Sequence, residues 1–418
     1  MTAGDAHRAV EAVWRIESAR VVAGLARLVR DVGLAEELAQ DVLVAALEQW
    51  PESGVPRNPG AWLVAAGRNR AIDLIRRDVN YRRKLAEIGR DLTEAVPDLA
   101  EAVGEDIEDD LLRLVFTACH PVLTTESRVA LTLRMLGGLT TREIARAFLS
   151  TEPTVGQRIS RAKKTLAEAK VPFETPHGAE RAARLPSVLE VIYLIFNEGY
   201  SATAGEDWLR PELCAEAMRL GRVLAGLMPE EAEVHGLVAL MELQASRNRA
   251  RVAPDGTPVL LLDQDRSRWD RLLITRGLAA LARAEELGRT RGPYTVQAEI
   301  AACHARARTA GETDWVRIAA QYQALALLVP SPVVELNRAV AVGMAFGPEP
   351  ALDLVEQLSQ EPALRGYHLL PAVKADLLGK LGRPREAVAE YERAAGLTSN
   401  AVQRSQLLER ATELRRSI

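Results

Sequence analysis

The sequence predicts an all-α protein built from two small helical domains followed by a larger helical-repeat domain. With 418 residues the chain exceeds one ordinary hydrophobic core, so two or three domains are expected. Its hydrophobic content of 48 % is enough to form sizeable cores. Alanine, leucine and arginine, which favour helices, are abundant, whereas aromatic residues make up only 4 %. These proportions indicate helices rather than sheets.

The N-terminal half predicts helices separated by short breaks. Apolar residues recur at helical spacing through 8–50, and the proline- and glycine-rich stretch 51–60 predicts a loop. Helical spacing resumes from Ala61 to about Ile88 and again over 109–170. Two prolines and a glycine in 171–178 mark the next boundary. The predicted domains are 1–90, an acidic linker 91–110, a second domain 111–172, a helical domain 180–294 and repeats over 295–418.

Composition also narrows the compartment and the chemistry. No apolar run reaches the roughly 18 residues of a membrane span, and charges interrupt the N-terminal segment, so a cytoplasmic protein is expected. Cys119, Cys214 and Cys303 lie far apart and predict neither a zinc site nor disulfides. The sequence shows no metal-binding histidine spacing, phosphate loop or nucleophile motif. We therefore expect no cofactor, no metal and no enzymatic activity.

The net charge of −4 hides an uneven distribution. Residues 68–90 contain eight basic and three acidic side chains, and residues 128–170 contain nine basic and three acidic ones. Between them, residues 91–112 hold nine acidic side chains and no basic one. Two basic modules joined by an acidic linker indicate contact with a polyanion such as a nucleic acid.

The segment 139–166 predicts a helix-turn-helix. Thr140 or Thr141 can cap a first helix that starts near Arg142. A turn over Ser150–Pro153 leads into a second helix that starts near Thr154.

The packing of this motif follows from its spacing. Ala145 in the first helix and Val155 in the second are ten residues apart, as expected for two helices that pack together, and Ile159 also points inward. Leu149 stands at the turn position where glycine is usual. The alternative is an α-hairpin with a solvated basic face. In a recognition helix, the outward residues that reach bases or phosphates would be Thr154, Gln157, Arg158, Arg161 and Lys164.

Three motifs in order, 35–51, 58–77 and the helix-turn-helix, resemble the extracytoplasmic-function group of bacterial RNA polymerase sigma factors. The resemblance covers about residues 1–170. It implies that domain 1–90 is sigma region 2, which recognises the promoter −10 element, and that 111–172 is region 4, which recognises the −35 element. The partners that it implies are promoter DNA and core RNA polymerase, contacted through the β′ clamp helices and the β subunit.

Glu37, Gln40 and Asp41 share one helix face because they are spaced i, i+3 and i+4. The resemblance implies that this face binds the clamp helices of β′. The alternative is a solvated acidic face.

The resemblance also implies that the second segment and the loop before it open the −10 DNA and hold a flipped base. Trp62 and Asp73 on this helix have alternative roles in the core or in helix stability. Arg82, Arg83 and Lys84 would contact phosphates. The residues proposed for −10 DNA are Ser53, Arg57, Asn58, Asn69, Arg70, Arg76 and Arg77.

The acidic linker has two interpretations. In the family that the chain resembles, the corresponding segment threads towards the basic channels of the polymerase. Composition alone is equally consistent with a disordered, solvated spacer.

The C-terminal half resembles a subset of these sigma factors that carries a long tetratricopeptide-like extension. Ala375, Gly382, Ala387, Tyr391 and Ala394 fall at the small and aromatic packing positions of that repeat. A regulatory protein or ligand could bind the extension. The C-terminal half also contains a polar set with two interpretations. These residues could line a groove for a ligand or a peptide, or they could fix loops and helix ends. They are Asn197, Glu198, Gln264, Asp265, Arg266 and Trp269.

Two other functions stay open from the sequence. A helix-turn-helix regulator with a helical sensor domain would not bind core polymerase, and a repeat scaffold would not bind DNA. The extension would inhibit or support the sigma activity, and truncation near residue 172 would separate those two cases.

Overall fold

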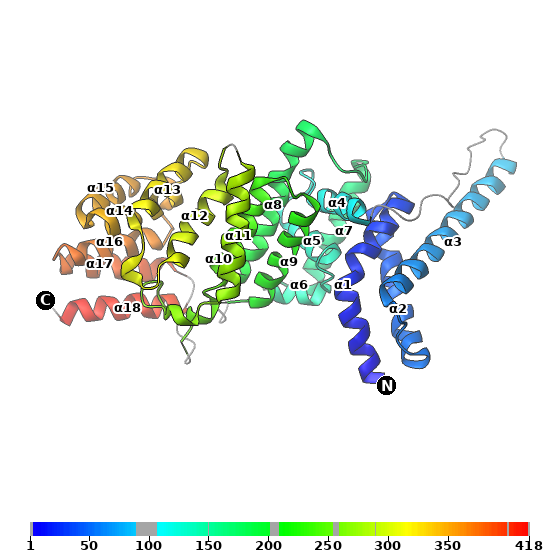
Figure 1. Ribbon diagram of the computed structural model, residues 1–418, viewed down its shortest axis with the longest axis horizontal. Helices are drawn as coiled ribbons and strands as arrows, with labels where there is room; N and C mark the ends of the chain where they lie inside the picture. Colours follow the sequence, from blue (N-terminus) through cyan, green and yellow to red (C-terminus); the bar gives the residue numbers. More distant parts are fainter. Residues whose placement is uncertain are drawn as a thin grey trace. The chain divides into compact units, whose positions relative to one another are not determined.

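The computed structural model is helical throughout the part of the chain that it describes (Figure 1). The described residues are 3–88, 107–148, 150–200, 209–253, 259–288, 290–398 and 401–416. Within these ranges there is no β-strand, which confirms the predicted fold class. The chain divides into two compact units, Met1–Leu194 and Ile195–Ile418, called unit 1 and unit 2 below.

Unit 1 contains the helices predicted from the sequence for the two basic modules. Helix α8 begins in unit 1 and ends in unit 2. The helices of unit 1, with α8 given in full, are α1 (Ala3–Val29), α2 (Val32–Ser53), α3 (Pro59–Ile88), α4 (Ile107–Ala118), α5 (Thr125–Met135), α6 (Thr141–Ala147), α7 (Glu152–Glu168) and α8 (Gly178–Tyr200).

Helices α1, α2 and α3 pack against one another to form the first module. Asp31 caps α2 because its Oδ1 accepts a hydrogen bond from the backbone N–H of Leu34 at 2.8 Å. The predicted loop 51–60 is too long: α2 continues through Pro51 to Ser53, and α3 already begins at Pro59. Proline has no N–H to donate, so Pro51 costs α2 one helical hydrogen bond, and the helix ends two residues later.

Helices α4 to α7 form the second module, and the first turns of α8 pack on it. The Arg184 guanidinium donates to the Phe116 carbonyl at 2.9 Å, and the Ser187 hydroxyl donates to the Cys119 carbonyl at 2.9 Å. Arg128 and Glu190 form an ion pair at 3.2 Å. The start of α8 therefore belongs structurally with the helices before it.

Unit 2 contains the remaining helices, and four short 3₁₀ helices lie in the connections between them. The α-helices are α9 (Pro211–Leu227), α10 (Ala232–Ala245), α11 (Arg271–Leu287), α12 (Pro293–Arg306), α13 (Trp315–Leu328), α14 (Pro332–Phe346), α15 (Pro348–Leu358), α16 (Leu369–Lys380), α17 (Pro384–Leu397) and α18 (Ala401–Arg416). The 3₁₀ helices are η1 (Asn248–Ala250), η2 (Arg266–Arg268), η3 (Ala310–Glu312) and η4 (Pro362–Leu364).

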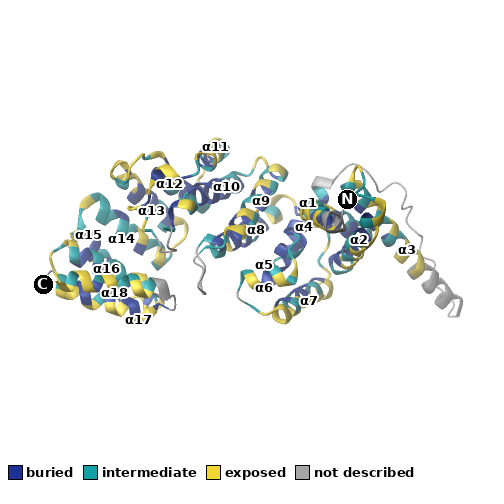
Figure 2. Ribbon diagram, turned by 90° about the horizontal axis from the view of Figure 1, so that it is seen from below, coloured by how far each residue is buried: buried dark blue, intermediate teal, exposed yellow. Residues whose placement is uncertain are grey.

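Helix α10 is the most buried element at the start of unit 2. Ten of its fourteen residues are buried, and it is drawn largely in dark blue (Figure 2). It packs against α9, α11 and α12. A helix that is apolar on all sides needs such neighbours on all sides.

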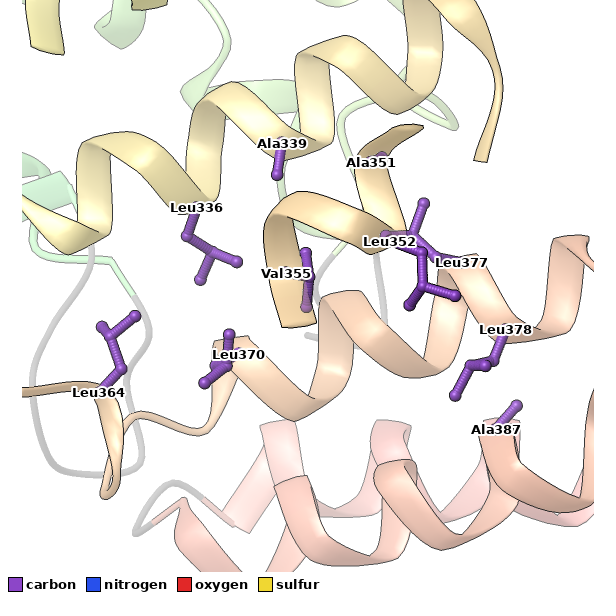
Figure 3. Packing of buried hydrophobic residues seen from close by; sticks show 10 residues of the cluster. All are labelled: Leu336, Ala339, Ala351, Leu352, Val355, Leu364, Leu370, Leu377, Leu378 and Ala387. Atoms are coloured by element: carbon purple, nitrogen blue, oxygen red, sulfur yellow. The ribbon is translucent and has the colours of Figure 1, made fainter. Parts of the chain in front are cut away.

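From α13 to α18, each helix packs chiefly on the helices next to it in sequence, as in an α-solenoid. Leucine, valine and alanine side chains from α14 to α17 and η4 form one core cluster there (Figure 3). Ala375, Ala387, Tyr391 and Ala394 are all buried, which confirms their predicted packing roles. Gly382 lies in the turn between α16 and α17 with φ of +72°, a conformation that favours glycine.

None of the described helices combines the length and apolarity needed to cross a membrane. The three cysteines are free and buried.

Candidate nucleic-acid interface

The first helix of the predicted helix-turn-helix, α6, begins with a capping box. The Thr140 hydroxyl accepts a hydrogen bond from the Glu143 N–H at 3.1 Å, and the Glu143 carboxylate accepts one from the Thr140 N–H at 2.8 Å. This reciprocal pair defines where α6 starts. Of the two candidate caps, Thr140 is therefore the one used.

The second helix, α7, starts at Glu152, two residues before the predicted position. The Thr151 side chain accepts a hydrogen bond from the Thr154 N–H at 3.3 Å, and Pro153 lies in the first turn. Proline is tolerated there because the N–H groups of a first turn have no helical partner. The predicted turn over Ser150–Pro153 is correspondingly shorter.

One face of α7 packs on the rest of the module. Its buried residues Val155, Ile159, Ala162 and Leu166 recur at helical spacing. Val155 and Ala145 are both buried where α6 contacts α7, which confirms the predicted packing. Leu149, whose place in the turn was noted in the sequence, lies outside the described residues.

The other face of α7 is open to solvent. Thr154, Gln157, Arg161 and Lys164 are exposed, and Arg158 is half-buried. The Thr154 hydroxyl is 2.8 Å from that of Thr151, so it also supports the start of the helix. The remaining four side chains form a polar, predominantly cationic surface.

Helix α3 carries the second predicted DNA surface. Asn69, Arg76 and Arg77 are exposed and Arg70 is half-buried, as is Trp62. Trp62 packs edge-on against buried Trp50 with ring centroids 5.4 Å apart, which supports the core role for this tryptophan. Asp73 is exposed. The side chains of Arg82, Arg83 and Lys84 lie outside the described part.

The three residues predicted for the loop before α3 lie at the surface, although Ser53 is the last residue of α2, and two of the three also make local contacts. The Asn58 side-chain oxygen accepts a hydrogen bond from the Ala61 N–H at 3.1 Å. The Ser53 hydroxyl donates to the Gln49 carbonyl at 2.8 Å. Arg57 is exposed. Asn58 and Ser53 thus also stabilise the ends of α3 and α2.

The predicted docking face lies on α2. Glu37 and Asp41 are exposed, and Gln40 is half-buried. The opposite side of α2 is buried against the core, with Leu38 and Val42 5 % and 0 % exposed. This face is therefore accessible within unit 1.

A buried ion-pair network joins α2 to the second module. Glu36, 5 % exposed, accepts a hydrogen bond from Arg134 Nε at 2.9 Å and one from Lys163 Nζ at 2.5 Å. Burial opposes ionisation of Glu36, but the two cations outweigh it, so the pKa of Glu36 lies below its ordinary value. Sequence reasoning missed this network, because no spacing links position 36 with positions 134 and 163.

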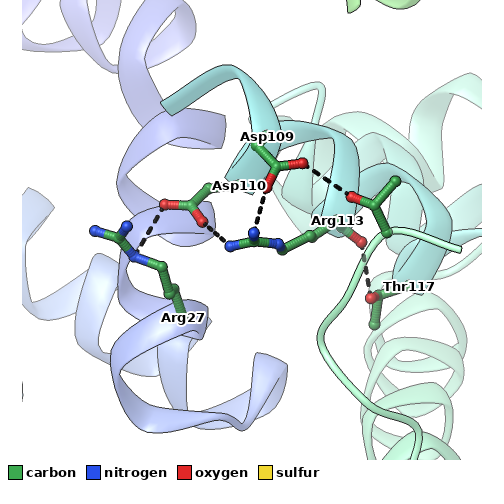
Figure 4. A network of polar contacts seen from close by, with 6 residues as sticks. Arg27, Asp109, Asp110, Arg113 and Thr117 are labelled. Carbon is green, nitrogen blue, oxygen red and sulfur yellow. Dashed lines mark hydrogen bonds and ion pairs between the residues drawn. The ribbon is translucent and has the colours of Figure 1, made fainter. Parts of the chain in front are cut away.

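A second network joins α1 to α4 (Figure 4). Arg27 of α1 forms an ion pair with Asp110 of α4 at 3.2 Å, and Arg113 forms one with the same carboxylate at 2.8 Å. Burial raises the pKa of Asp110, although both arginines oppose this. Of the acidic linker, Asp109 and Asp110 belong to α4, whereas 89–106 lies outside the described residues.

A pocket of about 650 Å³ lies beside these networks, and its lining includes Arg30, Lys163 and Lys170. Arg30 and Lys170 have left-handed backbone, with φ of 53° and 48°. Arg30 directly follows the end of α1, and Lys170 lies two residues after the end of α7, where cations are favoured by the helix dipole. Their positions are thus explained without a bound anion. Among the described residues, no cluster of histidine, cysteine or carboxylate side chains could hold a metal ion.

Comparison with known families matches three segments of the chain. Residues 15–80 match the description "Sigma-70 region 2", and residues 113–166 match "Sigma-70, region 4". Residues 184–285 match a family of unknown function, DUF6596. The first two matches coincide with the two basic modules of unit 1.

Individual relatives agree with these matches. An uncharacterized protein of Rhizobium meliloti (strain 1021) is 46 % identical over 91 % of this chain and 90 % of its own length. The ECF RNA polymerase sigma factor SigK of Mycobacterium ulcerans (strain Agy99) is 30 % identical over 35 % of this chain and 78 % of its own length. SigK of Mycobacterium tuberculosis (strain H37Rv) is 28 % identical over the same shares.

Proposed function

Since this chain belongs to the extracytoplasmic-function sigma factors and carries a C-terminal extension, we propose that unit 1 binds core RNA polymerase and reads both promoter elements. The observation that carries this proposal is the arrangement of α7. A buried apolar stripe holds the helix in its module, and a cationic face opposite that stripe is left for DNA.

For the −35 element, the proposal assigns Thr154, Gln157, Arg158, Arg161 and Lys164. Arginine and glutamine side chains can pair with guanine and adenine edges in the major groove, and lysine favours phosphates. Arg158 and Arg161 lie three residues apart, so both can face one groove.

For the −10 element, the proposal assigns Asn69, Arg70, Arg76 and Arg77 on α3 and the loop residues Ser53, Arg57 and Asn58. Opening DNA requires cations along the backbone and a polar pocket for an unstacked base. The exposed arginines of α3 supply the cations along the backbone. Arg57 is the strongest loop candidate, because Ser53 and Asn58 already have local hydrogen-bond partners.

For polymerase binding, the proposal assigns Glu37, Gln40 and Asp41 to the contact with the β′ clamp helices. The β subunit is proposed as a second contact. An exposed acidic face suits a basic partner surface, and mutual charge complementarity speeds association.

Transcription with purified components tests the proposal. The full chain, added to core polymerase, should yield promoter-specific transcripts from genomic templates that include the promoter of its own gene. Asp41→Arg should abolish both core binding and transcription, since it places a cation on the acidic face. The control is Glu11→Arg, the same change of charge at an exposed carboxylate on α1. Transcription that survives Asp41→Arg would instead support a regulator that does not bind core polymerase.

For the extension, we propose a regulatory or supporting role in which a ligand or protein binds unit 2. Comparing transcription by the full chain with transcription by a chain ending after Leu194 separates an inhibitory role from a supporting one. Higher activity of the shorter chain means that the extension inhibits, and lost activity means that it is required. Equal activity would contradict both roles.

A further inference from the structure

A polar cluster in unit 2 is not explained by promoter recognition. It includes Gln264, Arg266 and Trp269, which are 8 %, 7 % and 3 % exposed. Of the other polar residues singled out in the sequence, Glu198 forms an ion pair with Arg210, and Asp265 caps η2. Glu198 and Asp265 therefore have structural roles. Arg266 and Trp269 have further neighbours among arginine and aromatic side chains.

Three arginines stack on two aromatic rings in this cluster. The guanidinium carbon of Arg251 is 3.6 Å from the ring centroid of Tyr200, and that of Arg266 is 4.9 Å from the centroid of Trp269. The guanidinium carbon of Arg247 lies 5.9 Å from both centroids. Cation–π contacts stabilise such cations but do not neutralise their charge.

The polar partners of Arg247 and Arg266 are neutral. Arg266 donates to the carbonyls of His304 and Ala307 at 2.7 and 2.8 Å and to the Thr313 hydroxyl at 2.9 Å. Arg247 donates to the Tyr200 hydroxyl. Among the described residues, no carboxylate lies within ion-pair distance of either guanidinium. Burial and the nearby charge of Arg247 lower the pKa of Arg266, an effect that Glu312 opposes from further away.

Several buried N–H groups here lack an acceptor among the described residues. They are Nε of Arg247, Nε of Arg266 and the indole Nε1 of Trp269. These nitrogens can only donate, and leaving a buried donor without an acceptor is unfavourable. The neighbouring ring nitrogen Nδ1 of His304 also has no partner. The cluster thus combines excess positive charge with unused donors.

Trp269 of this cluster also lines a surface pocket of about 670 Å³. Arg249, Arg268 and Arg271 also line it and are exposed. The one carboxylate in the lining, Asp270, already accepts hydrogen bonds from two backbone N–H groups of α11. The pocket has the size of a small-molecule site, and its charge is positive.

We propose that Arg247, Arg266 and Trp269 form a binding site for a small-molecule oxyanion, a phosphate or a carboxylate group, that enters through this pocket. An oxyanion supplies acceptors and negative charge, which the unused donors of Arg247, Arg266 and Trp269 lack. Guanidinium groups pair with both oxyanions through charge-assisted hydrogen bonds. The indole N–H adds a directed donor. This makes unit 2 a sensor of an anionic small molecule.

Isothermal titration calorimetry of the full chain tests the site, with inorganic phosphate and citrate as separate probes at constant ionic strength set by chloride. At least one probe should bind saturably. Binding of phosphate alone identifies a phosphate-bearing ligand, and binding of citrate alone identifies a carboxylate ligand. Because no polymerase or DNA is present, failure of this experiment is distinct from failure of the proposed promoter recognition.

Two variants connect the binding to the cluster. Arg247→Gln should weaken binding at least tenfold, and Trp269→Phe, which keeps an aromatic ring but removes the indole N–H, should weaken it about fivefold. The control Arg276→Gln removes an exposed arginine on α11 outside the pocket lining and should leave binding unchanged. If Arg247→Gln fails to fold, Trp269→Phe still provides the test. No saturable binding of either probe, or binding unchanged in the variants, would overturn the proposal.

Discussion

Glu36 of α2 and Lys163 of α7 form a hydrogen-bonded ion pair at 2.5 Å, although 127 residues separate them in sequence. Glu36 directly precedes Glu37 of the proposed polymerase-docking face, and Lys163 directly precedes Lys164 of the proposed DNA-binding face. It therefore connects the two surfaces on which the proposed function depends. With Arg134 as the second cation, the Glu36 carboxylate links the two modules of unit 1.

Replacing Glu36 with glutamine should destabilise unit 1 by about 3–5 kcal/mol, because it leaves two largely buried cations without their carboxylate. Urea unfolding followed by circular dichroism measures this change. Glu37→Gln is the matched control: the same chemical change on an exposed side chain should alter stability by less than about 0.5 kcal/mol. Equal losses in both variants would show that the network does not stabilise the contact between the modules.

Replacing Arg158 with alanine should cost about 1–3 kcal/mol of DNA binding, roughly a five- to 150-fold rise in Kd, if Arg158 contacts a base. Fluorescence anisotropy with promoter and non-promoter duplexes measures the loss, which should be larger for the promoter. Lys164→Ala should weaken both duplexes alike and reduce the slope of log K against log salt by about 0.9. Arg276→Ala in unit 2 serves as the control. A uniform loss for Arg158→Ala would assign it to phosphate.

Lowering the pH should destabilise unit 2 through His304. Burial, together with Arg247 and Arg266, lowers the pKa of this imidazole from 6.5 to about 3. Between these values the unfolded chain takes up a proton that the folded chain does not. The free energy of unfolding should therefore fall as the pH drops below about 6.5, by up to about 1.4 kcal/mol per pH unit, with no contribution above that pH.

Calorimetric melting between about pH 4 and pH 8, in steps of about one pH unit, measures this dependence. His304→Gln should flatten the slope, since it removes the titrating group. His177→Gln replaces an exposed imidazole and should leave the slope in place. A slope that persists in His304→Gln would assign the pH dependence to other groups.

Ending the chain after Pro172 should be more damaging to unit 1 than ending it after Leu194. The shorter chain loses the Arg184 and Ser187 hydrogen bonds to the carbonyls of Phe116 and Cys119 and uncovers the buried residues beneath them. Thermal unfolding of the two truncated chains should show a lower Tm for the one that ends at Pro172. Equal Tm values would mean that α8 contributes nothing to the second module.

The sequence by itself determined the helices and their local contacts. Helical spacing, the Thr140 cap and the ten-residue separation of Ala145 and Val155 depend on neighbours within one or two turns, so they can be read along the chain. The outward residues of α7 follow from the same periodicity, because they lie on the side of the helix opposite its buried stripe. The start of α7 was misplaced by two residues, since Thr151 rather than a later residue caps it.

Only the tertiary structure decided which distant charges meet. Glu36, Arg134 and Lys163 read in sequence as members of ordinary charged faces, and their pairing depends on how α2, α5 and α7 pack. In the same way, Arg247, Arg266 and Trp269 come from a loop and a 3₁₀ helix that carry no periodic signal. Burial gives these side chains their energetic weight, because a charge removed from water needs a partner, and burial is a property of the packed fold.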